Sequence, residues 1–102
     1  MSTFRPVGPA SDLAPGTVNP YYLEDRKQRI AVARVGDALY AFDDLHADGS
    51  LSAGLLDGTT IMSQCDGTRF DVTTGAVLDG PTTGPLAVYP VREADGQIEI
   101  GV

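Results

Sequence analysis

The chain is organised around one stretch, Phe42–Asp71, which reads FDDLHADGSLSAGLLDGTTIMSQCDGTRFD. It contains two loops with polar side chains, joined by a short hairpin around Asp57-Gly58. The first loop carries Asp44-Leu45-His46, and the second runs from Ser63 to Gly67. Residue types that bind metals or carry out acid–base chemistry therefore gather at two points, and we expect the function to lie there.

Outside this stretch, short apolar runs alternate with turns. The chain has 12 glycines and 7 prolines among 102 residues, which favours a turn-rich, all-β fold over helices. Alternation and β-branched residues predict strands at 3–7, 17–23, 29–35, 38–42, 70–72 and 76–78, a hairpin over 55–62 with its turn at Asp57-Gly58, and a last hairpin between 86–91 and 97–102 around Ala94-Asp95-Gly96.

Three local predictions bear on how the strands pack. Pro20 places its strand at a sheet edge or a bend, because proline cannot donate to a ladder. Leu39 and Ala41 should face one side of their strand, and Tyr40 and Phe42 the other. That strand follows a turn at Gly36-Asp37 and delivers the chain directly into the first loop.

Charge and composition exclude several classes of function. The net charge of −7 argues against tracking of nucleic-acid phosphates and suits docking to a basic partner. One cysteine allows no internal disulfide, no run approaches membrane-spanning length, and the N-terminus lacks the apolar core of a secretory signal. We therefore expect an acidic, soluble, cytoplasmic protein with no membrane or nucleic-acid partner.

The frame around the two loops resembles the cluster-binding half of Rieske-type ferredoxins. In that family the first loop reads Cys-x-His, followed by Leu-Ser-x-Gly, and the second reads Cys-x-x-His-Gly, followed two residues later by Phe-Asp. This chain has Leu51-Ser52-Ala53-Gly54, and later Gly67-Thr68-Arg69-Phe70-Asp71. The segments Thr74–Val77 and Gly80-Pro81 also match, so the resemblance runs from about Phe4 to Val102.

The resemblance implies a small antiparallel sandwich or barrel with a two-loop cluster-binding subdomain. We expect residues 1–102 to form one domain, with the loop subdomain at about 43–81. It further implies a [2Fe-2S] cofactor and single-electron transfer between a ferredoxin reductase and an oxygenase. Phe70 is expected beneath the loops as core, Asp71 as the cap of a turn, and Pro81 over the loop tips or as a stiff turn.

The residues at the family's four ligand positions are mostly different here. Asp44 stands at the first Cys position and His46 at the first His position. Ser63 stands at the second Cys position and Asp66 at the second His position, while Cys65 falls on a spacer. A Rieske centre needs two thiolates and two imidazoles, so we expect no [2Fe-2S] cluster to bind in the family's manner.

Three arrangements of these ligand positions stay open. Asp44, His46 and Asp66 could hold a single iron, manganese or zinc ion, with Ser63 or Cys65 as a further contact. Alternatively, a protonated His46 could lie between the two aspartates as an internal pair. In the third arrangement, the two loops splay into solvent and carry no site.

Two further interpretations of the polar residues in the loops have less support from the sequence. Ser63, His46 and Asp44 could suggest a hydrolase triad, but no nucleophile-elbow sequence surrounds the serine. Shifting the second loop so that Cys65 takes a ligand position would put Thr68 where the histidine belongs and break the Gly67–Asp71 frame. We expect Cys65 to be an ordinary small residue near the surface.

Three functions follow from these alternatives. The chain is an electron-transfer ferredoxin or a descendant of one, a non-redox binding module on the same fold, or a carrier of a mononuclear metal site with catalytic potential. Electron transfer or binding is favoured over catalysis. One sequence does not distinguish natural from engineered ligand replacement.

Overall fold

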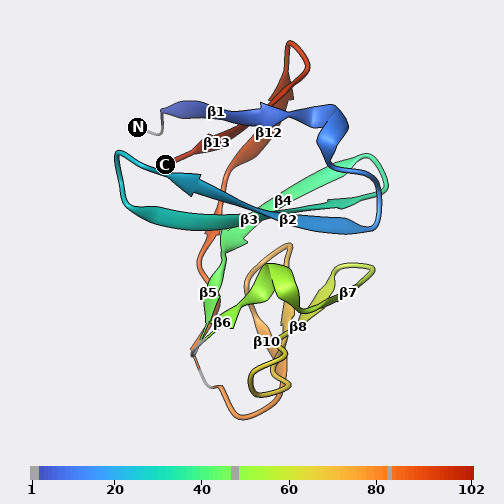
Figure 1. Ribbon diagram of the computed structural model, residues 1–102. Coiled ribbons are helices and arrows are strands. Elements are labelled where there is room, and N and C mark those ends of the chain that lie inside the picture. The colour runs from blue at the N-terminus through green and yellow to red at the C-terminus, as the bar shows by residue number, and fades with distance from the viewer. Residues whose placement is uncertain (1–2, 47–48, 83) are drawn as a thin grey trace.

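The computed structural model describes residues 3–46, 49–82 and 84–102, and their regular secondary structure is almost entirely strand (Figure 1). Two short 3₁₀ helices interrupt the strands, η1 at Ala10–Asp12 and η2 at Leu51–Ala53. The strands are β1 Phe4–Pro9, β2 Thr17–Leu23, β3 Gln28–Val35, β4 Ala38–Asp43, β5 Leu45–His46, β6 Gly49–Ser50, β7 Leu55–Asp57, β8 Thr60–Met62, β9 Arg69–Asp71, β10 Val77–Asp79, β11 Val88–Tyr89, β12 Val91–Ala94 and β13 Gln97–Gly101. The predicted all-β antiparallel fold is confirmed.

Two sheets make up the upper half of Figure 1, which we call the base. One has the strand order β1-β13-β12 and the other β11-β4-β3-β2. An aliphatic core lies between them, built on the buried residues Ala10, Leu13, Leu23, Ile30, Val32, Ala41, Ile98 and Ile100. The base is therefore held together by the burial of apolar side chains between two sheets.

The lower half of Figure 1, which we call the loop part, follows β4. It contains the sheet β10-β9-β8-β7 and the small pair β5-β6. A second core lies between these strands and the β3–β4 hairpin of the base. It is built on the buried residues Ala31, Ala33, Phe42, Leu51, Ile61, Phe70, Val72 and Leu86. The predicted placement of Phe70 as core is confirmed.

Strands β3 and β4 belong to both cores because their side chains alternate between two faces. Leu39 and Ala41 contact the upper core, and Tyr40 and Phe42 contact the lower one, as the alternation predicts. The turn at Gly36-Asp37 sets their register, with Val35 opposite Ala38 and Ile30 opposite Asp43. This hairpin therefore fixes where the first loop begins.

The edge position predicted from Pro20 is also confirmed. Strand β2 is the last strand of its sheet and pairs with β3 on one side only, with Pro20 opposite Ala31. A proline is tolerated there because its missing N–H faces the open side of the sheet.

The predicted last hairpin between 86–91 and 97–102 is wrong in its first half. Val88 and Tyr89 of β11 pair with Phe42 and Ala41 of β4, whereas the following strand β12 pairs with β13. Pro90 lies between the two short strands, and its lack of an N–H prevents one continuous ladder. The chain therefore crosses from one base sheet to the other at this residue.

The first strand is longer than the pattern predicts. It continues to Pro9 and leads into η1, whereas the predicted strand ends at residue 7. A register shift between Pro6 and Gly8 lets the strand keep pairing with β13 despite its prolines.

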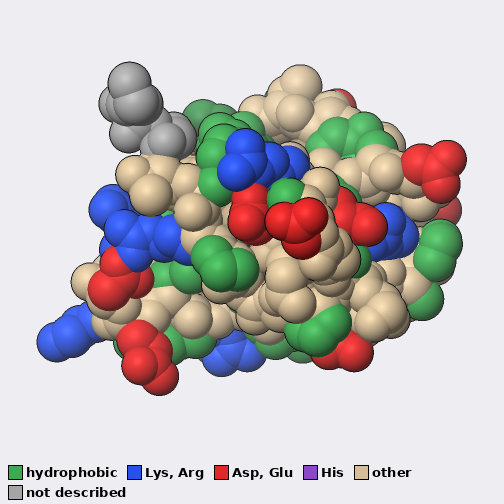
Figure 2. Space-filling view, turned by 90° about the horizontal axis from the view of Figure 1, so that it is seen from above, with side chains coloured by type: hydrophobic (Ala, Val, Ile, Leu, Met, Phe, Trp, Pro, Cys, Tyr) green, Lys and Arg blue, Asp and Glu red, His purple; other side chains and the backbone are tan. Residues whose placement is uncertain are grey.

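Charged side chains cover the top of the base. Figure 2 looks down on this face and shows acidic groups side by side with basic ones. Glu99 lies 2.7 Å from Nε of Arg92, and Glu93 lies 3.2 Å from Arg34. Arg92 also stacks over the ring of Phe4 at 4.0 Å from its centroid. Several charges of the base are therefore paired with each other.

Candidate functional site

The first loop begins with a buried acid. Asp44 follows β4 and is 0 % exposed, and its Oδ2 lies 2.6 Å from Nε of Arg29 on β3. The β3–β4 register produces this contact, because a ladder with Ile30 opposite Asp43 puts Arg29 opposite Asp44. The backbone N–H of Asp44 also donates to the carbonyl of Arg29 at 3.1 Å. A buried carboxylate is costly unless it is paired, and here a guanidinium opposes its charge.

The remaining acceptors of Asp44 hold the segment that follows the loop. Its Oδ1 accepts the N–H of Ser52 at 2.7 Å, and its carbonyl accepts the N–H of Leu51 at 2.7 Å. Both donors belong to η2, whose Leu51 side chain lies in the lower core. Asp44 therefore connects β3 with η2 through its side chain and its backbone.

The second loop turns tightly at Ser63. The N–H of this residue donates to the carbonyl of Thr68 at 2.9 Å, and its own carbonyl accepts the N–H of Gly67 at 2.9 Å. Its Oγ accepts the N–H of Cys65 at 3.2 Å, and Ser63 as a whole is buried. The hydroxyl therefore stabilises the turn locally, as serine side chains commonly do.

Asp66 is bound to the segment that follows β10. Its Oδ1 accepts the N–H of Thr68 at 3.0 Å, and its Oδ2 accepts the hydroxyl of Thr82 at 3.1 Å. The hydroxyl of Thr68, which is fully buried, donates to that of Thr82 at 3.1 Å. These bonds form a short polar chain from Thr68 through Thr82 to Asp66.

Two close approaches occur at the loops, one between the two loops and one between the second loop and the segment after β10. The Sγ of Cys65 lies against Gly49 of the first loop, where an added Cβ would collide with it. Gly80 lies against the backbone of Thr68, and its φ of 113° is one that residues with a Cβ rarely adopt. Glycine at both positions allows this packing, and Cys65 is otherwise exposed, as predicted.

His46 is described through its backbone, which pairs with Gly49 in the β5–β6 ladder. Its side chain lies outside the described part, so both the expected metal site and the expected pairing with the aspartates stay predictions. Among the residues whose side chains are described, no group of three or more His, Cys, Asp or Glu could hold a metal ion. Asp44, Ser63 and Asp66 each have partners of their own.

A family comparison agrees with this arrangement of sheets and loops. Residues 3–101 match the model of the Rieske-like [2Fe-2S] domain. The chain belongs to this family. Its Leu-Ser-x-Gly, Gly-x-x-Phe-Asp and Gly-Pro segments thus lie in the scaffold of a Rieske domain, as the resemblance implied.

The relatives of this Rieske-family chain are ferredoxin components of oxygenase systems. Ferredoxin CarAc of Metapseudomonas resinovorans is 39% identical over 98 residues, covering 89% of this chain and 86% of the relative. The anthranilate 1,2-dioxygenase ferredoxin subunit of Burkholderia cepacia is 40% identical over 75 residues, covering 72% and 69%. These relatives place the chain among proteins whose family transfers electrons.

Solved structures show the same fold. A chain in the complex of reduced oxygenase and oxidized ferredoxin in carbazole 1,9a-dioxygenase matches with a TM-score of 0.86 and 37% identity, covering 96% of this chain and 92% of that one. The Sphingomonas yanoikuyae B1 ferredoxin matches with a TM-score of 0.87 and 28% identity, covering 98% and 99%. A ferredoxin with this fold therefore forms a complex with its oxygenase in the carbazole system.

The residues at the ligand positions do not fit a Rieske cluster. Such a cluster takes two cysteine thiolates on one iron and two imidazoles on the other. Here the first Cys position holds a carboxylate already committed to Arg29 and Ser52. The second Cys position holds a serine, and Asp66 stands where the second histidine belongs. By the resemblance, only one of the four family ligand residues keeps its type in this sequence, His46.

The rest of the Rieske frame keeps its structural role. Asp71 caps the turn after β9, as predicted, because its Oδ1 accepts the hydroxyl and the N–H of Thr73 at 2.6 and 2.9 Å. These two bonds, the hydroxyl first, hold the pKa of Asp71 below its usual value. The turn that leads from β9 to β10 is therefore fixed by its own side chains.

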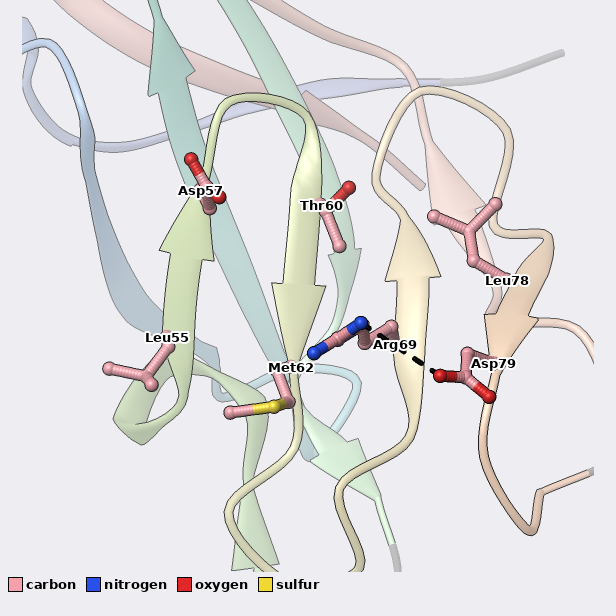
Figure 3. A pocket seen from close by; sticks show the side chains of 7 residues that line it. All are labelled: Leu55, Asp57, Thr60, Met62, Arg69, Leu78 and Asp79. Carbon is pink, nitrogen blue, oxygen red and sulfur yellow. Dashed lines mark ion pairs between the residues drawn. The ribbon is translucent and has the colours of Figure 1, made fainter.

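A shallow hollow of about 530 Å³ lies on the outer face of the sheet of the loop part (Figure 3). Leu55, Met62, Arg69 and Asp79 lie in one row across its four strands. A register shift between Val77 and Asp79 accompanies the exposure of Leu78, and Arg69 lies 3.8 Å from Asp79. The seven residues that line the hollow include no His, Cys or Ser, so it offers a partly apolar surface and no nucleophile–base pair.

Two residues of the site were missed from the sequence, Arg29 and Thr82. The signal for Arg29 was present, because a two-residue turn at Gly36-Asp37 places position 29 opposite position 44. No sequence pattern pointed to Thr82, which meets Asp66 only through the tertiary fold. Within the described residues, no helix has the length and apolar character needed to cross a membrane.

Proposed function

We propose that this chain is a docking component of an oxygenase system that occupies the place of a ferredoxin without passing electrons through a [2Fe-2S] cluster. Its family, its ferredoxin relatives and its acidic charge support binding to an oxygenase or a ferredoxin reductase. Acidic surfaces of small electron carriers commonly meet basic patches on their partners. The cluster-free state is the part of the proposal that sets this chain apart from those relatives.

One observation carries the cluster-free state, the burial of Asp44 beside Arg29 at the first cysteine position. A thiolate there would face iron, whereas this carboxylate faces a guanidinium 2.6 Å away and an amide 2.7 Å away. Carboxylate and hydroxyl oxygens are hard donors that do not replace thiolates in an iron–sulfur centre. Three of the four family ligand types are thus missing, and the first position is already used by the protein.

The cofactor state is tested on purified protein expressed with iron and sulfide supplied. We expect a colourless sample with no stoichiometric iron or acid-labile sulfide, and no rhombic electron-resonance signal after reduction. A brown sample with such a signal would restore the electron-transfer function and overturn the cluster-free proposal.

The same sample tests the mononuclear alternative at Asp44, His46, Ser63 and Asp66. One equivalent of iron, manganese or zinc that survives gel filtration, and that is lost in His46→Ala, would establish that site. We expect no such retained ion, because Asp44 and Asp66 already have partners in the protein.

Docking is tested by competition in the carbazole 1,9a-dioxygenase system. The chain is added to the oxygenase and its ferredoxin, and the rate of electron delivery is measured over a range of salt. We expect inhibition that weakens as salt rises, because charge attraction is screened. A lack of inhibition and of direct binding at low salt, for both the oxygenase and the ferredoxin reductase, would contradict docking.

A matched pair of surface variants sharpens this test. Leu45 lies in the first loop and Tyr22 on the edge strand β2, and their exposed fractions are 60% and 58%. If the loops face the partner, Leu45→Asp weakens the inhibition several-fold while Tyr22→Asp leaves it unchanged. Equal effects of the two variants would place the docking surface elsewhere.

A further inference from the structure

The residues at the ligand positions have acquired new partners within the protein. Asp44 makes one ion pair and three hydrogen bonds, which reach Arg29 on β3 and both Leu51 and Ser52 on η2. The first loop lies between these two elements. One buried residue therefore ties both ends of the first loop to the rest of the fold.

The second loop has a comparable set of ties. Asp66 is bound through Oδ1 to the N–H of Thr68 and through Oδ2 to the hydroxyl of Thr82. Thr82 also bonds the buried hydroxyl of Thr68. This loop is thus held to the segment after β10, while Cys65 packs its Sγ on Gly49 of the first loop.

We propose that these contacts form a protein-only clamp that holds the two loops in the place where cluster-binding relatives use a metal cross-link. The clamp consists of the Arg29–Asp44 ion pair, the Thr68–Thr82–Asp66 hydrogen bonds and the Cys65–Gly49 contact. It goes beyond the proposed function, since the loops could dock without being clamped or be clamped without docking.

The charges of the loops also fit this arrangement. Two carboxylates at neighbouring ligand positions repel each other unless something compensates them. Arg29, whose side chain is 43% exposed, opposes the buried charge of Asp44 as an ion pair, and hydrogen bonds from Thr68 and Thr82 satisfy Asp66. Neither compensation needs iron, so the clamp predicts loops that are ordered without any metal.

The first experiment compares thermal unfolding and amide hydrogen exchange before and after exhaustive chelation. We expect the same unfolding midpoint and the same slow exchange of the amides of Ser52 and Thr68, which donate to Asp44 and Asp66. A lower midpoint or faster exchange after chelation, reversed by returning iron, would overturn the clamp. That outcome is separate from a failure of docking, which the competition assay measures.

The second experiment breaks the ion pair from each side. Arg29→Met leaves a buried carboxylate without its counter-charge, whereas Asp44→Asn removes the charge and keeps an acceptor for Ser52. We expect the midpoint to fall by about 10 °C in Arg29→Met and by about half as much in Asp44→Asn. The double variant should lose less than the sum, because it buries no unpaired charge.

A surface ion pair provides the matched control. Arg92 and Glu99 on β12 and β13 are 2.7 Å apart, close to the 2.6 Å of Arg29 and Asp44, but both side chains are more exposed, so Glu99→Gln should move the midpoint by only about 2 °C or less. If the losses in Asp44→Asn and Arg29→Met are no larger than in this control, the clamp is refuted. If Arg29→Met fails to fold, the comparison of Asp44→Asn with Glu99→Gln still decides.

The second loop is tested with Thr82→Val, which removes a hydroxyl and keeps the shape of the side chain. We expect faster exchange of the Thr68 amide and unchanged exchange of the Ser52 amide. Thr17→Val is the control, since its hydroxyl bonds Ala14 in an exposed turn of the base. Equal exchange in the two variants would show that Thr82 does not hold the second loop.

Discussion

The base and the loop part of this Rieske-family chain are stabilised in different ways. The residues buried between the two base sheets are apolar, among them Ile30, Val32, Ile98 and Ile100. Every buried polar or charged residue among those described belongs to the loop part: Asp44, Ser63 and Thr68. The base therefore depends on apolar packing, and the loop part adds hydrogen bonds of buried residues and an ion pair to its own apolar core.

This difference indicates which residues can be substituted so that the chemistry of the loops changes while the fold is kept. The two cores and the glycines near the loops keep the scaffold, while the polar positions of the loops decide what the scaffold holds. A buried polar network must be satisfied in full or it costs stability. Asp44 has an ion pair and hydrogen bonds within the protein, and Asp66 has hydrogen bonds; the cluster-free state of this scaffold is the proposal that these contacts support.

The largest expected effect comes from returning the family's donors to the loops. The triple variant Asp44→Cys, Ser63→Cys and Asp66→His, which keeps His46, should change from colourless to brown when reconstituted with iron and sulfide. The reason is that the frame is intact and only the donors differ. Visible absorbance and electron resonance of the reduced protein measure the outcome.

The matched control for this restoration is the double variant Asp44→Cys and Asp66→His, which lacks the second thiolate and should stay colourless. If the triple variant folds and still takes up no cluster, the loop part differs from the family in more than its donors. The comparison of base and loop part would then need revision.

Truncating one residue in each core gives the next largest effect. Phe70→Ala in the loop part should lower the free energy of unfolding by about 3–5 kcal/mol, and Ile98→Ala in the base by about 2–5 kcal/mol. Leu55→Ala on the exposed face should change it by about 0.5 kcal/mol or less. Urea unfolding followed by circular dichroism measures all three, and a Phe70→Ala value as small as that of Leu55→Ala would contradict the second core.

A smaller effect is expected on the stability of the loop part at acid pH. The pKa of Asp71 in the loop part is lowered by Thr73, so its stabilisation is complete above the unfolded pKa and is lost as pH falls through the folded pKa. Thr73→Val should raise the pKa of Asp71 toward 3.8 and reduce stability at neutral pH but not in strong acid. Carboxyl titration by nuclear magnetic resonance checks this, and an unchanged pKa would show that the hydroxyl is not responsible.

The smallest expected effect is on the ionisation of Tyr89 in the base at alkaline pH. Burial first, and then the charge of Asp43, raise the pKa of Tyr89, although a hydrogen bond from Gln28 at 2.6 Å acts against them. Stabilisation from a raised pKa is complete below the unfolded value and is lost as pH rises through the folded one. Asp43→Asn should lower the pKa of Tyr89, as followed by phenolate absorbance, and a rise instead would contradict the role of the acid.

Features of the fold could be predicted from the sequence where they depend on a residue and its immediate neighbours. Alternation gave the two faces of β4, and Pro20 gave the edge strand, because side-chain direction and a missing donor act at the residue itself. The switch of sheets at Pro90 was not found, since an apolar run on both sides of a proline looks like one strand. The expected domain limits, with a loop subdomain at about 43–81, remain a prediction.

For the candidate site, the sequence indicated which residues to consider but not which residues they contact. The motif frame singled out Asp44, Ser63 and Asp66, whose role as ligand positions stays a prediction, while their partners depend on register and on tertiary packing. Arg29 could have been derived by counting outward from the Gly36-Asp37 turn, because the hairpin ladder is strictly pairwise. Thr82 could not, since nothing in its neighbourhood indicates that it will meet a loop 16 residues earlier.

The contact of Cys65 with Gly49 has a practical consequence. The chain has a single cysteine, it is exposed, and it sits at the seam where the two loops touch. A spin label or fluorophore can therefore be attached there without first removing other thiols. Because Cys65 packs against Gly49, a bulky label would push the two loops apart. A small label is therefore the better choice for measuring changes in the distance between the loops.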